Sequence, residues 1–535
     1  MDRRDFLQSA VVLGAARRLP AAGTAPRTAP PAVVQSFELE EATIASLSAG
    51  MASGRWTARG ITEQYLARIA AIDKAGPTLN AVIELNPEAL RIADQLDAER
   101  RERRPRGPLH GIPVLVKDNL DTGDQMRTTA GSLALANSRA PRDSAVVASL
   151  RRAGAVLLGK TNLSEWANYR STSSTSGWSG RGGLTRNPYV LDRNACGSSS
   201  GSGAAGAANL AAVTIGTETD GSITCPASIC ALVGIKPTVG LVSRAGIIPI
   251  SATQDTAGPM CRTVADAALV LEAIQGADPR DAATRRSEGR TGTPYADLLH
   301  RGALKGARLG VAHKGFGLPA SVDPVLAEAT AALKGLGAVI VDPAEIPNVE
   351  KLGDPELVVL DFEFKAGMAD YLASRGPGSG VRSLADLIAF NAANREKEMP
   401  WFGQEIFERA DKKGPLTDPV YRNALARCRQ LSRSLGIDAV MSRHRLDALI
   451  AITAGPTWPI DLVNGDRYTG GATSPAAVAG YPHITVPAGW VHGLPIGLSF
   501  FGRAWSDGKL IGMAYDFEQE TRIRKAPSYV ESIDR

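Results

Sequence analysis

Short apolar segments alternate with amphipathic helical ones along most of this chain, and this alternation constrains its fold more than any other feature. In GIPVLVKDN, residues 111–119, valines alternate with leucine and lysine, which predicts a strand that ends at Lys117. The helical pattern SAVVASLRRAG runs into the apolar AVLLG, and DPVLAEATAALKGLG runs into AVIV. LDALIAI, HITVPAG and PIGLSFFG complete the strands. The pattern predicts an α/β fold with a mixed, twisted β-sheet core surrounded by α-helices.

The chain after its N-terminal segment reads as a single large domain. Thr57 is placed to cap a helix whose apolar residues recur at helical spacing, and a second helix is expected to start after Asn86. Residues 382–413 look like a helical insertion rather than a new domain. No convincing linker interrupts residues 38–525. We therefore expect one domain over residues 34–535.

The first 33 residues resemble a twin-arginine signal peptide. Arg3 and Arg4 are followed by Phe-Leu, a short apolar stretch and a Pro/Ala-rich leader that ends at Val33. The alternative is an amphipathic N-terminal helix. No apolar run approaches the ~20 residues that span a bilayer. We expect the twin-arginine export machinery as a partner, a periplasmic or secreted location, and no stable membrane insertion.

Charge and cysteine content exclude some classes of partner and ligand. Lys plus Arg exceed Asp plus Glu by 60 − 55, or +5, which is too dilute over 535 residues to indicate nucleic acid. The five cysteines lack the paired spacing of a zinc site, and their odd number gives no disulfide framework. The five cysteines are Cys196, Cys225, Cys230, Cys261 and Cys428. We expect them to be free buried thiols, with one disulfide among them as the alternative. We predict no metal and no cofactor.

The segment CGSSSGSGAAGAANLAAVTIGTETDGSITCPAS, residues 196–228, is the strongest functional signal. GSSSGSG alone resembles a flexible linker, but helix and strand material follows it at once, and a second small-residue turn closes that strand. Linkers do not lie between core elements. A glycine-rich turn at a helix start brings hydroxyls and backbone N–H groups close to a substrate. We therefore interpret this segment as part of a functional site.

Two further motif matches in the sequence are interpreted as coincidences. Ser199 is central in a GxSxG match, but no strong strand precedes it, and the six histidines show no partner pattern for an α/β-hydrolase. GAVLLGKT, residues 154–161, formally matches a P-loop, but its intervening residues are apolar and strand-like. Neither a histidine-dependent hydrolase nor a nucleotide site is expected.

Taken together, GSSSGSG, TETDGSITCPAS and GIKPT, with GIPVLVKDN upstream, resemble the amidase signature hydrolases. KTNLSEW, TSGWSGRGG, AGYPHITVPAG and GLPIGLSFFGR follow in that family's usual order, so the resemblance covers roughly residues 40–525. TETDGSITCPAS and FEFKAGMADYL are most similar to bacterial peptide amidases. Cys196, Ser200, Asp220 and Thr224 depart from the commoner family pattern, which leaves the substrate open.

The resemblance implies a Ser-Ser-Lys site, with Lys117 as base, Ser198 as proton relay and Ser222 as nucleophile. A serine hydroxyl needs a base within hydrogen-bond reach, and a lysine serves only when burial lowers its pKa enough to make it neutral. The alternative for Lys117 is a surface lysine or a partner of Asp118. The resemblance also implies a cis peptide before Ser198 and an oxyanion hole formed by the backbone N–H groups of Thr219, Asp220, Gly221 and Ser222.

The predicted activity is metal-free hydrolysis of a carboxamide to an acid and ammonia or an amine, with C-terminal peptide amides as one candidate substrate. Two alternatives remain open. One is the A-type component of a glutamine amidotransferase, against which export argues. The other is a non-catalytic exported binding protein that keeps the fold. Two roles for the Asp220 side chain stay open on equal terms: it contacts an amine of the substrate, or it caps a turn.

Overall fold

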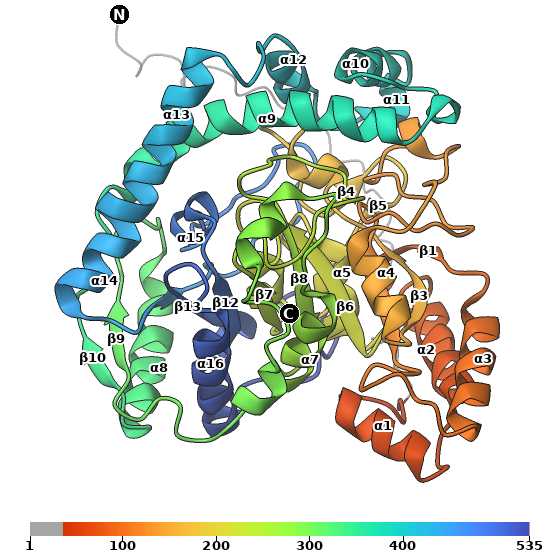
Figure 1. Cartoon of the computed structure of the whole chain (residues 1–535), viewed down its shortest axis with the longest axis horizontal. Coiled ribbons are helices and arrows are strands. Elements are labelled where there is room, and N and C mark those ends of the chain that lie inside the picture. Colours follow the sequence, from red (N-terminus) through yellow and green to blue (C-terminus); the bar gives the residue numbers. More distant parts are fainter. Residues whose placement is uncertain (1–35, 534–535) are drawn as a thin grey trace, which may run out of the picture. The chain divides into compact units, whose positions relative to one another are not determined.

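A computed structural model describes residues 36–533, and eleven strands of that part form one mixed sheet in the order β1-β3-β2-β6-β8-β7-β12-β13-β11-β9-β10 (Figure 1). Its strands are β1 (Val82–Leu85), β2 (Pro113–Lys117), β3 (Val156–Thr161), β6 (Val213–Glu218), β7 (Val233–Lys236), β8 (Thr256–Cys261), β9 (Arg308–Val311), β10 (Val339–Val341), β11 (Ala448–Ile452), β12 (His483–Val491) and β13 (Leu494–Phe501). The short β4 (Trp178–Ser179) and β5 (Gly183–Leu184) pair separately.

The sheet is parallel near both ends and antiparallel in its middle. β3, β2 and β6 run parallel, as do β11, β9 and β10, whereas β6, β8, β7, β12, β13 and β11 pair antiparallel in turn. This arrangement confirms the predicted mixed α/β sheet. The late strands β12 and β13 lie inside the sheet, between β7 and β11, and β1 and β10 lie at its ends.

Helices pack around this sheet, as the alternation predicts. They are α1 (Ile44–Ala52), α2 (Ala58–Ile72), α3 (Ala89–Arg101), α4 (Ala145–Arg152), α5 (Ser200–Ala207), α6 (Thr224–Ile229), α7 (Val264–Ile274), α8 (Asp323–Gly335), α9 (Gly353–Ser374), α10 (Leu384–Ala393), α11 (Arg395–Glu398), α12 (Glu405–Asp411), α13 (Pro419–Arg429), α14 (Asp438–His444), α15 (Ser474–Ala479) and α16 (Asp507–Thr521). A π-helical segment, η8 (Gln430–Ile437), joins α13 to α14.

Local signals place several of these helices correctly. The Thr57 side chain accepts a hydrogen bond from the backbone N–H of Gly60 at the start of α2. α3 begins at Ala89 rather than directly after Asn86, because the Asn86 side chain accepts the N–H of Glu88 and forms a turn before the helix. The predicted insertion is helical: α10 and α12 lie against α9, and α11 packs on α10 (Figure 1).

The helix α5 is made almost entirely of small residues because it packs close to the sheet. All eight of its residues are buried. A Cβ atom on Gly201 would lie 2.4 Å from the carbonyl oxygens of both Ala81 and Asn162, so only glycine fits there. The Gly/Ser segment is therefore a core helix rather than a linker, and its N-terminus carries the residues of the candidate site.

No helix within residues 36–533 is long and apolar enough to cross a membrane. The signal peptide predicted for residues 1–33 lies outside the described residues.

Candidate active site

Lys117 lies fully buried at the end of β2, as the sequence predicts. Its Nζ atom is 2.7 Å from Ser198 Oγ, 2.9 Å from Thr217 Oγ1 and 3.3 Å from the Thr217 carbonyl oxygen. The parallel register of β2 and β6 pairs Val116 with Ile215, which brings the ends of both strands together. Lys117 therefore contacts the relay serine predicted from the sequence, and no salt bridge joins it to its neighbour Asp118 within the described residues.

Burial lowers the pKa of Lys117 to about 7, and the more distant negative charges of Asp255 and Glu218 offset part of that effect. Neither carboxylate is within salt-bridge distance of the amine in the described structure. A substantial fraction of the amine is therefore neutral near pH 7, which gives Lys117 the protonation state that a general base requires.

Ser198 lies directly before α5 and follows a cis peptide bond from Gly197, as the resemblance implies. Its backbone carbonyl accepts a hydrogen bond from the N–H of Ser164. The side chain is 1% exposed and directed at Lys117 Nζ. Ser198 is thus held from both its backbone and its side chain.

Ser222 lies between β6 and α6, next to the segment that carries Ser198. The N–H of Ser199 donates to the Ser222 carbonyl over 3.2 Å, so the two serine-bearing segments are joined directly. Among residues 36–533 the Ser222 hydroxyl makes no hydrogen bond, and the residue is 8% exposed. The structure brings the two segments side by side and leaves this hydroxyl available to a substrate.

The turn before Ser222 presents unpaired backbone donors. From Thr219 to Ser222, none of the four backbone N–H groups donates to another group of the described chain. Gly221 adopts the left-handed region with φ 77°, which favours glycine at this position. Four free N–H groups beside a serine hydroxyl form the kind of arrangement that stabilises an oxyanion.

Side chains that the sequence analysis did not single out hold this turn in place. One Glu218 carboxylate oxygen accepts hydrogen bonds from the backbone N–H groups of Ile223 and Thr224, each at 2.8 Å, and one from the Thr224 hydroxyl. Thr219 donates its hydroxyl to Asp255 over 2.6 Å, and burial raises the pKa of Asp255 to about 6. Glu218 lies within the TETDGS motif, whereas Asp255 follows it by more than thirty residues and gives no local signal.

Residues 60–511 of the chain match the Amidase family. The native peptide amidase of Stenotrophomonas maltophilia is 52% identical and matches with a TM-score of 0.88, covering 92% of this chain and 100% of that chain. A probable amidase of Arabidopsis thaliana is 43% identical over 505 residues, which are 92% of this chain and 93% of the relative. The chain belongs to the amidase family.

Similarity also extends to proteins of a different biochemical role. The A-type component of the glutamyl-tRNA(Gln) amidotransferase of Halorhodospira halophila is 34% identical over 506 residues, which are 91% of this chain and 99% of the relative. The higher identity to the peptide amidase structure supports a hydrolase that acts on amides. The predicted amidase signature fold is also confirmed by this match.

The cysteines of this amidase-family member correct a prediction. Cys196 and Cys225 form a disulfide, which is the alternative to the free thiols that the sequence analysis favoured. The remaining three cysteines, Cys230, Cys261 and Cys428, are free and buried. The two bonded cysteines are 29 residues apart, and they meet because Cys196 precedes Ser198 and Cys225 follows Ser222 in adjacent segments. An odd cysteine count cannot reveal a pairing that depends on tertiary structure.

Asp220 lies in the same turn, and its carboxylate is held at the start of α15. Burial raises its pKa, and hydrogen bonds with the Ser474 and Thr473 side chains oppose that rise. One carboxylate oxygen, Oδ1, is buried without a hydrogen-bond partner in the described structure. These contacts join the 219–222 turn to α15 and leave one carboxylate oxygen of Asp220 unbonded.

The rejected motifs have structural roles in this amidase fold. Ser199 donates its hydroxyl to the Thr217 carbonyl, and Lys160 donates from within β3 to the Leu120 carbonyl and the Thr128 hydroxyl. The ring of His483 is buried against Ser499, and burial lowers its pKa to about 3. No cluster of three or more metal-ligating side chains occurs in residues 36–533.

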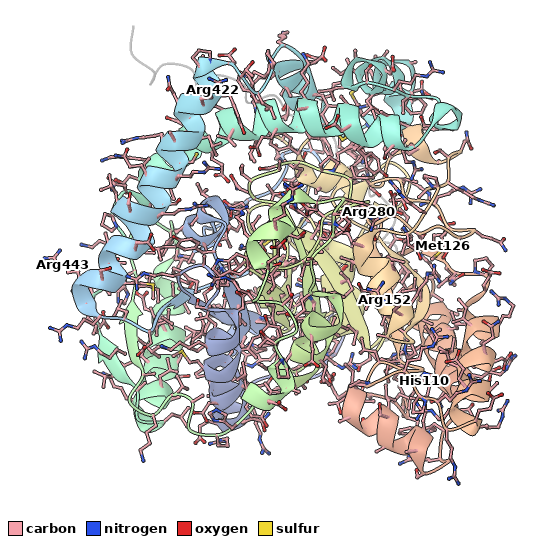
Figure 2. All side chains as sticks on the ribbon, in the orientation of Figure 1. His110, Met126, Arg152, Arg280, Arg422 and Arg443 are labelled. Carbon is pink, nitrogen blue, oxygen red and sulfur yellow. A yellow bond between two sulfur atoms is a disulfide. The ribbon has the colours of Figure 1, made fainter. Side chains whose placement is uncertain are left out.

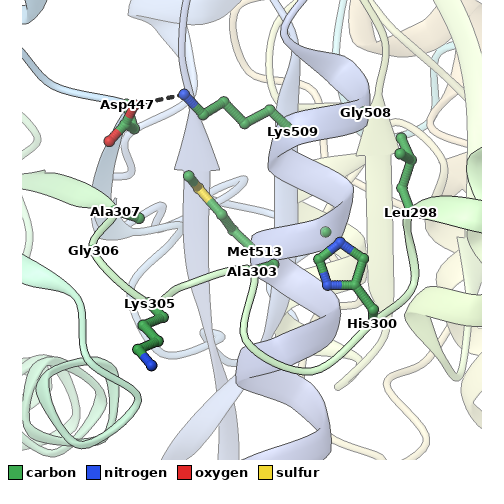
Figure 3. A pocket seen from close by; sticks show the side chains of 11 residues that line it. Leu298, His300, Ala303, Lys305, Gly306, Ala307, Asp447, Gly508, Lys509 and Met513 are labelled. Atoms are coloured by element: carbon green, nitrogen blue, oxygen red, sulfur yellow. Dashed lines mark hydrogen bonds and ion pairs between the residues drawn. The ribbon is translucent and has the colours of Figure 1, made fainter.

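A cavity of about 550 Å³ lies away from these residues, between α16 and the chain around residues 298–307 (Figure 3). Lys509 and Asp447 form an ion pair at one side of it, His300 lies at the opposite side, and Met513 lies between them (Figure 3). None of the residues predicted for catalysis lines this cavity.

Proposed function

We propose that this protein hydrolyses carboxamides through an acyl-enzyme on Ser222, with Ser198 as relay and Lys117 as base. The observation that carries the proposal is the 2.7 Å contact between Lys117 Nζ and Ser198 Oγ in a fully buried setting. This contact supplies the base that a serine nucleophile requires. Within residues 36–533 no histidine forms a hydrogen bond with Lys117, Ser198 or Ser222.

The contacts of Lys117 favour a defined proton arrangement. A neutral amine has two N–H groups and one lone pair. The Thr217 carbonyl and hydroxyl oxygens accept the two N–H groups, which directs the lone pair at Ser198. Asn119 also donates to the Thr217 hydroxyl oxygen over 2.9 Å and keeps it in place. Ser198 is then the donor to Lys117, and its own oxygen can accept the Ser222 proton once the unbonded Ser222 hydroxyl turns toward it.

In the first half of the reaction, the Ser222 oxygen attacks the substrate carbonyl carbon. The Ser222 proton moves to Ser198, whose own proton moves to Lys117, and the developing oxyanion is bound by the free N–H groups of the 219–222 turn. The protons then return along the same path to the leaving nitrogen. The carbon–nitrogen bond breaks, ammonia or an amine departs, and an acyl-Ser222 ester remains.

In the second half, water repeats these steps. It attacks the ester carbonyl while its proton passes to Lys117, and the return of a proton to the Ser222 oxygen releases the acid. The side chains named here supply all the proton transfers, so the proposed cycle contains no cofactor or metal step.

The narrower proposal for the substrate is a C-terminal peptide amide. It is supported by the 52% identity to a peptide amidase over nearly the whole chain. Purified protein incubated with a panel of peptide amides, simple carboxamides, esters and glutamine should convert peptide amides fastest, read as a mass gain of about 1 Da when a terminal amide becomes an acid. Turnover of glutamine alone would favour the amidotransferase alternative, and no turnover with any member would favour the binding protein.

We also propose export by the twin-arginine route, on the basis of the sequence of residues 1–33 alone. A fusion of this segment to a folded reporter should reach the periplasm. Replacement of Arg3 and Arg4 by lysine should retain the reporter in the cytoplasm, and export that persists in this variant would contradict the proposal.

A further inference from the structure

A second cavity, of about 220 Å³, lies at the C-terminal end of α15, where three arginines converge. Arg286 comes from a 3-10 helix (Ala282–Ser287), Arg429 from the end of α13, and Arg433 from η8. The predicted catalytic residues are absent from its walls. We propose that this cavity binds a small oxyanion of the phosphate class, independently of the proposed hydrolase function.

The charge of the cavity is not balanced by its own walls. None of the residues that line it is an aspartate or a glutamate. Within residues 36–533 the guanidinium groups of Arg286 and Arg429 make no hydrogen bond and no salt bridge. Three positive side chains that line one partly open pocket repel each other, so an anion bound between them would relieve that repulsion.

Arg433 is the most buried of the three arginines, and its contacts leave its charge unpaired. Its Nε donates to the Ala479 carbonyl over 2.9 Å, and the guanidinium lies 5.6 Å from the centre of the Tyr481 ring. Burial lowers the pKa of Arg433, and the like charges of Arg429 and Arg286 lower it further. The backbone contact fixes the guanidinium and leaves its remaining N–H groups for a ligand.

Two carboxylates close to wall residues of this cavity already have other partners. Asp438 accepts the Tyr481 hydroxyl at 3.0 Å and lies 3.5 Å from Arg503. Glu363 accepts the hydroxyl of Thr253, a wall residue, at 3.0 Å. Asp438 attracts Arg433 from a distance, but within residues 36–533 neither carboxylate forms a salt bridge with any of the three arginines, so most of their positive charge is left for a ligand.

The shape and chemistry of the site favour a tetrahedral oxyanion. A guanidinium presents parallel N–H donors that match two oxygens of one phosphate or sulfate group. Three guanidinium groups from separate elements surround such an ion on several sides, whereas a planar carboxylate offers only two oxygens. The small volume limits the ligand to inorganic phosphate or sulfate, or to the phosphate group of a small ester.

Isothermal titration of the purified full-length protein with inorganic phosphate tests this site, with sodium chloride at matched ionic strength as the blank. We expect saturable binding that Arg429→Gln and Arg286→Gln each weaken about tenfold to hundredfold, the range of one charge-assisted contact. Both side chains are exposed, so these variants should fold. Titration with glycerol phosphate distinguishes the source: tighter binding than phosphate indicates an ester ligand, and weaker binding indicates the free ion.

Arg422→Gln is the matched control, because Arg422 is an exposed arginine near the start of α13 that does not line the cavity (Figure 2). This variant should bind phosphate like the wild type. The proposal is overturned if phosphate produces no saturable signal beyond that of chloride. It is equally overturned if Arg422→Gln weakens binding as much as Arg429→Gln does.

Discussion

Replacement of Lys117 by methionine should change how the stability of the protein depends on pH. Burial lowers the pKa of this lysine from 10.5 to about 7 in the folded chain, whereas the unfolded chain keeps the ordinary value. Between these two values the unfolded state binds one proton more than the folded state. The free energy of unfolding therefore rises with pH by about 1.4 kcal/mol per unit from this residue alone.

The direction in which the free energy of unfolding changes with pH follows from the lowered pKa of Lys117. Below about pH 7 the folded state bears the full cost of charging a buried amine, about 4 to 5 kcal/mol, and this cost disappears as pH rises toward 10.5. Lys117→Met removes this term. The wild-type protein should therefore gain about 2 to 3 kcal/mol relative to the variant between pH 7.5 and pH 9.5.

Urea unfolding of both proteins at pH 7.5, 8.5 and 9.5 measures this difference, because other titrating groups contribute equally to both. Lys305→Met, which removes an exposed lysine, is the control and should show a difference from wild type that does not vary with pH. The loss of the Lys117 hydrogen bonds adds only a constant offset. Parallel stability curves for wild type and Lys117→Met would refute the neutral-lysine argument.

Three further predictions concern the site. Ser198→Ala should lower kcat by about a hundredfold or more, because the members of a proton relay act as a unit. Kinetics measure the loss, and circular dichroism checks that the fold is intact. A loss below about tenfold would exclude Ser198 as the proton relay. The double variant Cys196→Ser, Cys225→Ser should lose about 2 to 4 kcal/mol of stability and part of its kcat, and a reductant should shift the melting temperature of the wild type but not of this variant. Prolonged dialysis against EDTA should leave turnover unchanged, and zinc-dependent recovery would contradict the metal-free mechanism.

Local patterns were sufficient to predict the parts of the fold that depend on nearby residues. The alternation in GIPVLVKDN placed Lys117 at a strand end, and the small residues after Gly197 indicated a packed helix rather than a linker. Both signals are local, because each is carried by neighbouring residues of a single strand or helix. The family resemblance also led to the contact between Lys117 and Ser198, which the structure contains.

Features that depend on distant segments could not be predicted. The disulfide between Cys196 and Cys225 requires two loops to meet, and a cysteine count does not say which loops do so. The convergence of Arg286 and Arg429 joins segments more than a hundred residues apart, and neither arginine belongs to a recognisable motif. The positions of β12 and β13 inside the sheet follow from long-range pairing, to which hydrophobic periodicity is insensitive.

Covalent labelling with a fluorophosphonate tests most directly whether Ser222 is the nucleophile. The reagent forms a stable phosphonyl ester with an activated serine, and peptide mapping by mass spectrometry identifies the residue. We predict one label per chain, on Ser222, with loss of labelling in Ser222→Ala and strong reduction in Lys117→Met. A label on Ser199, or equal labelling of wild type and Lys117→Met, would contradict the Ser-Ser-Lys assignment.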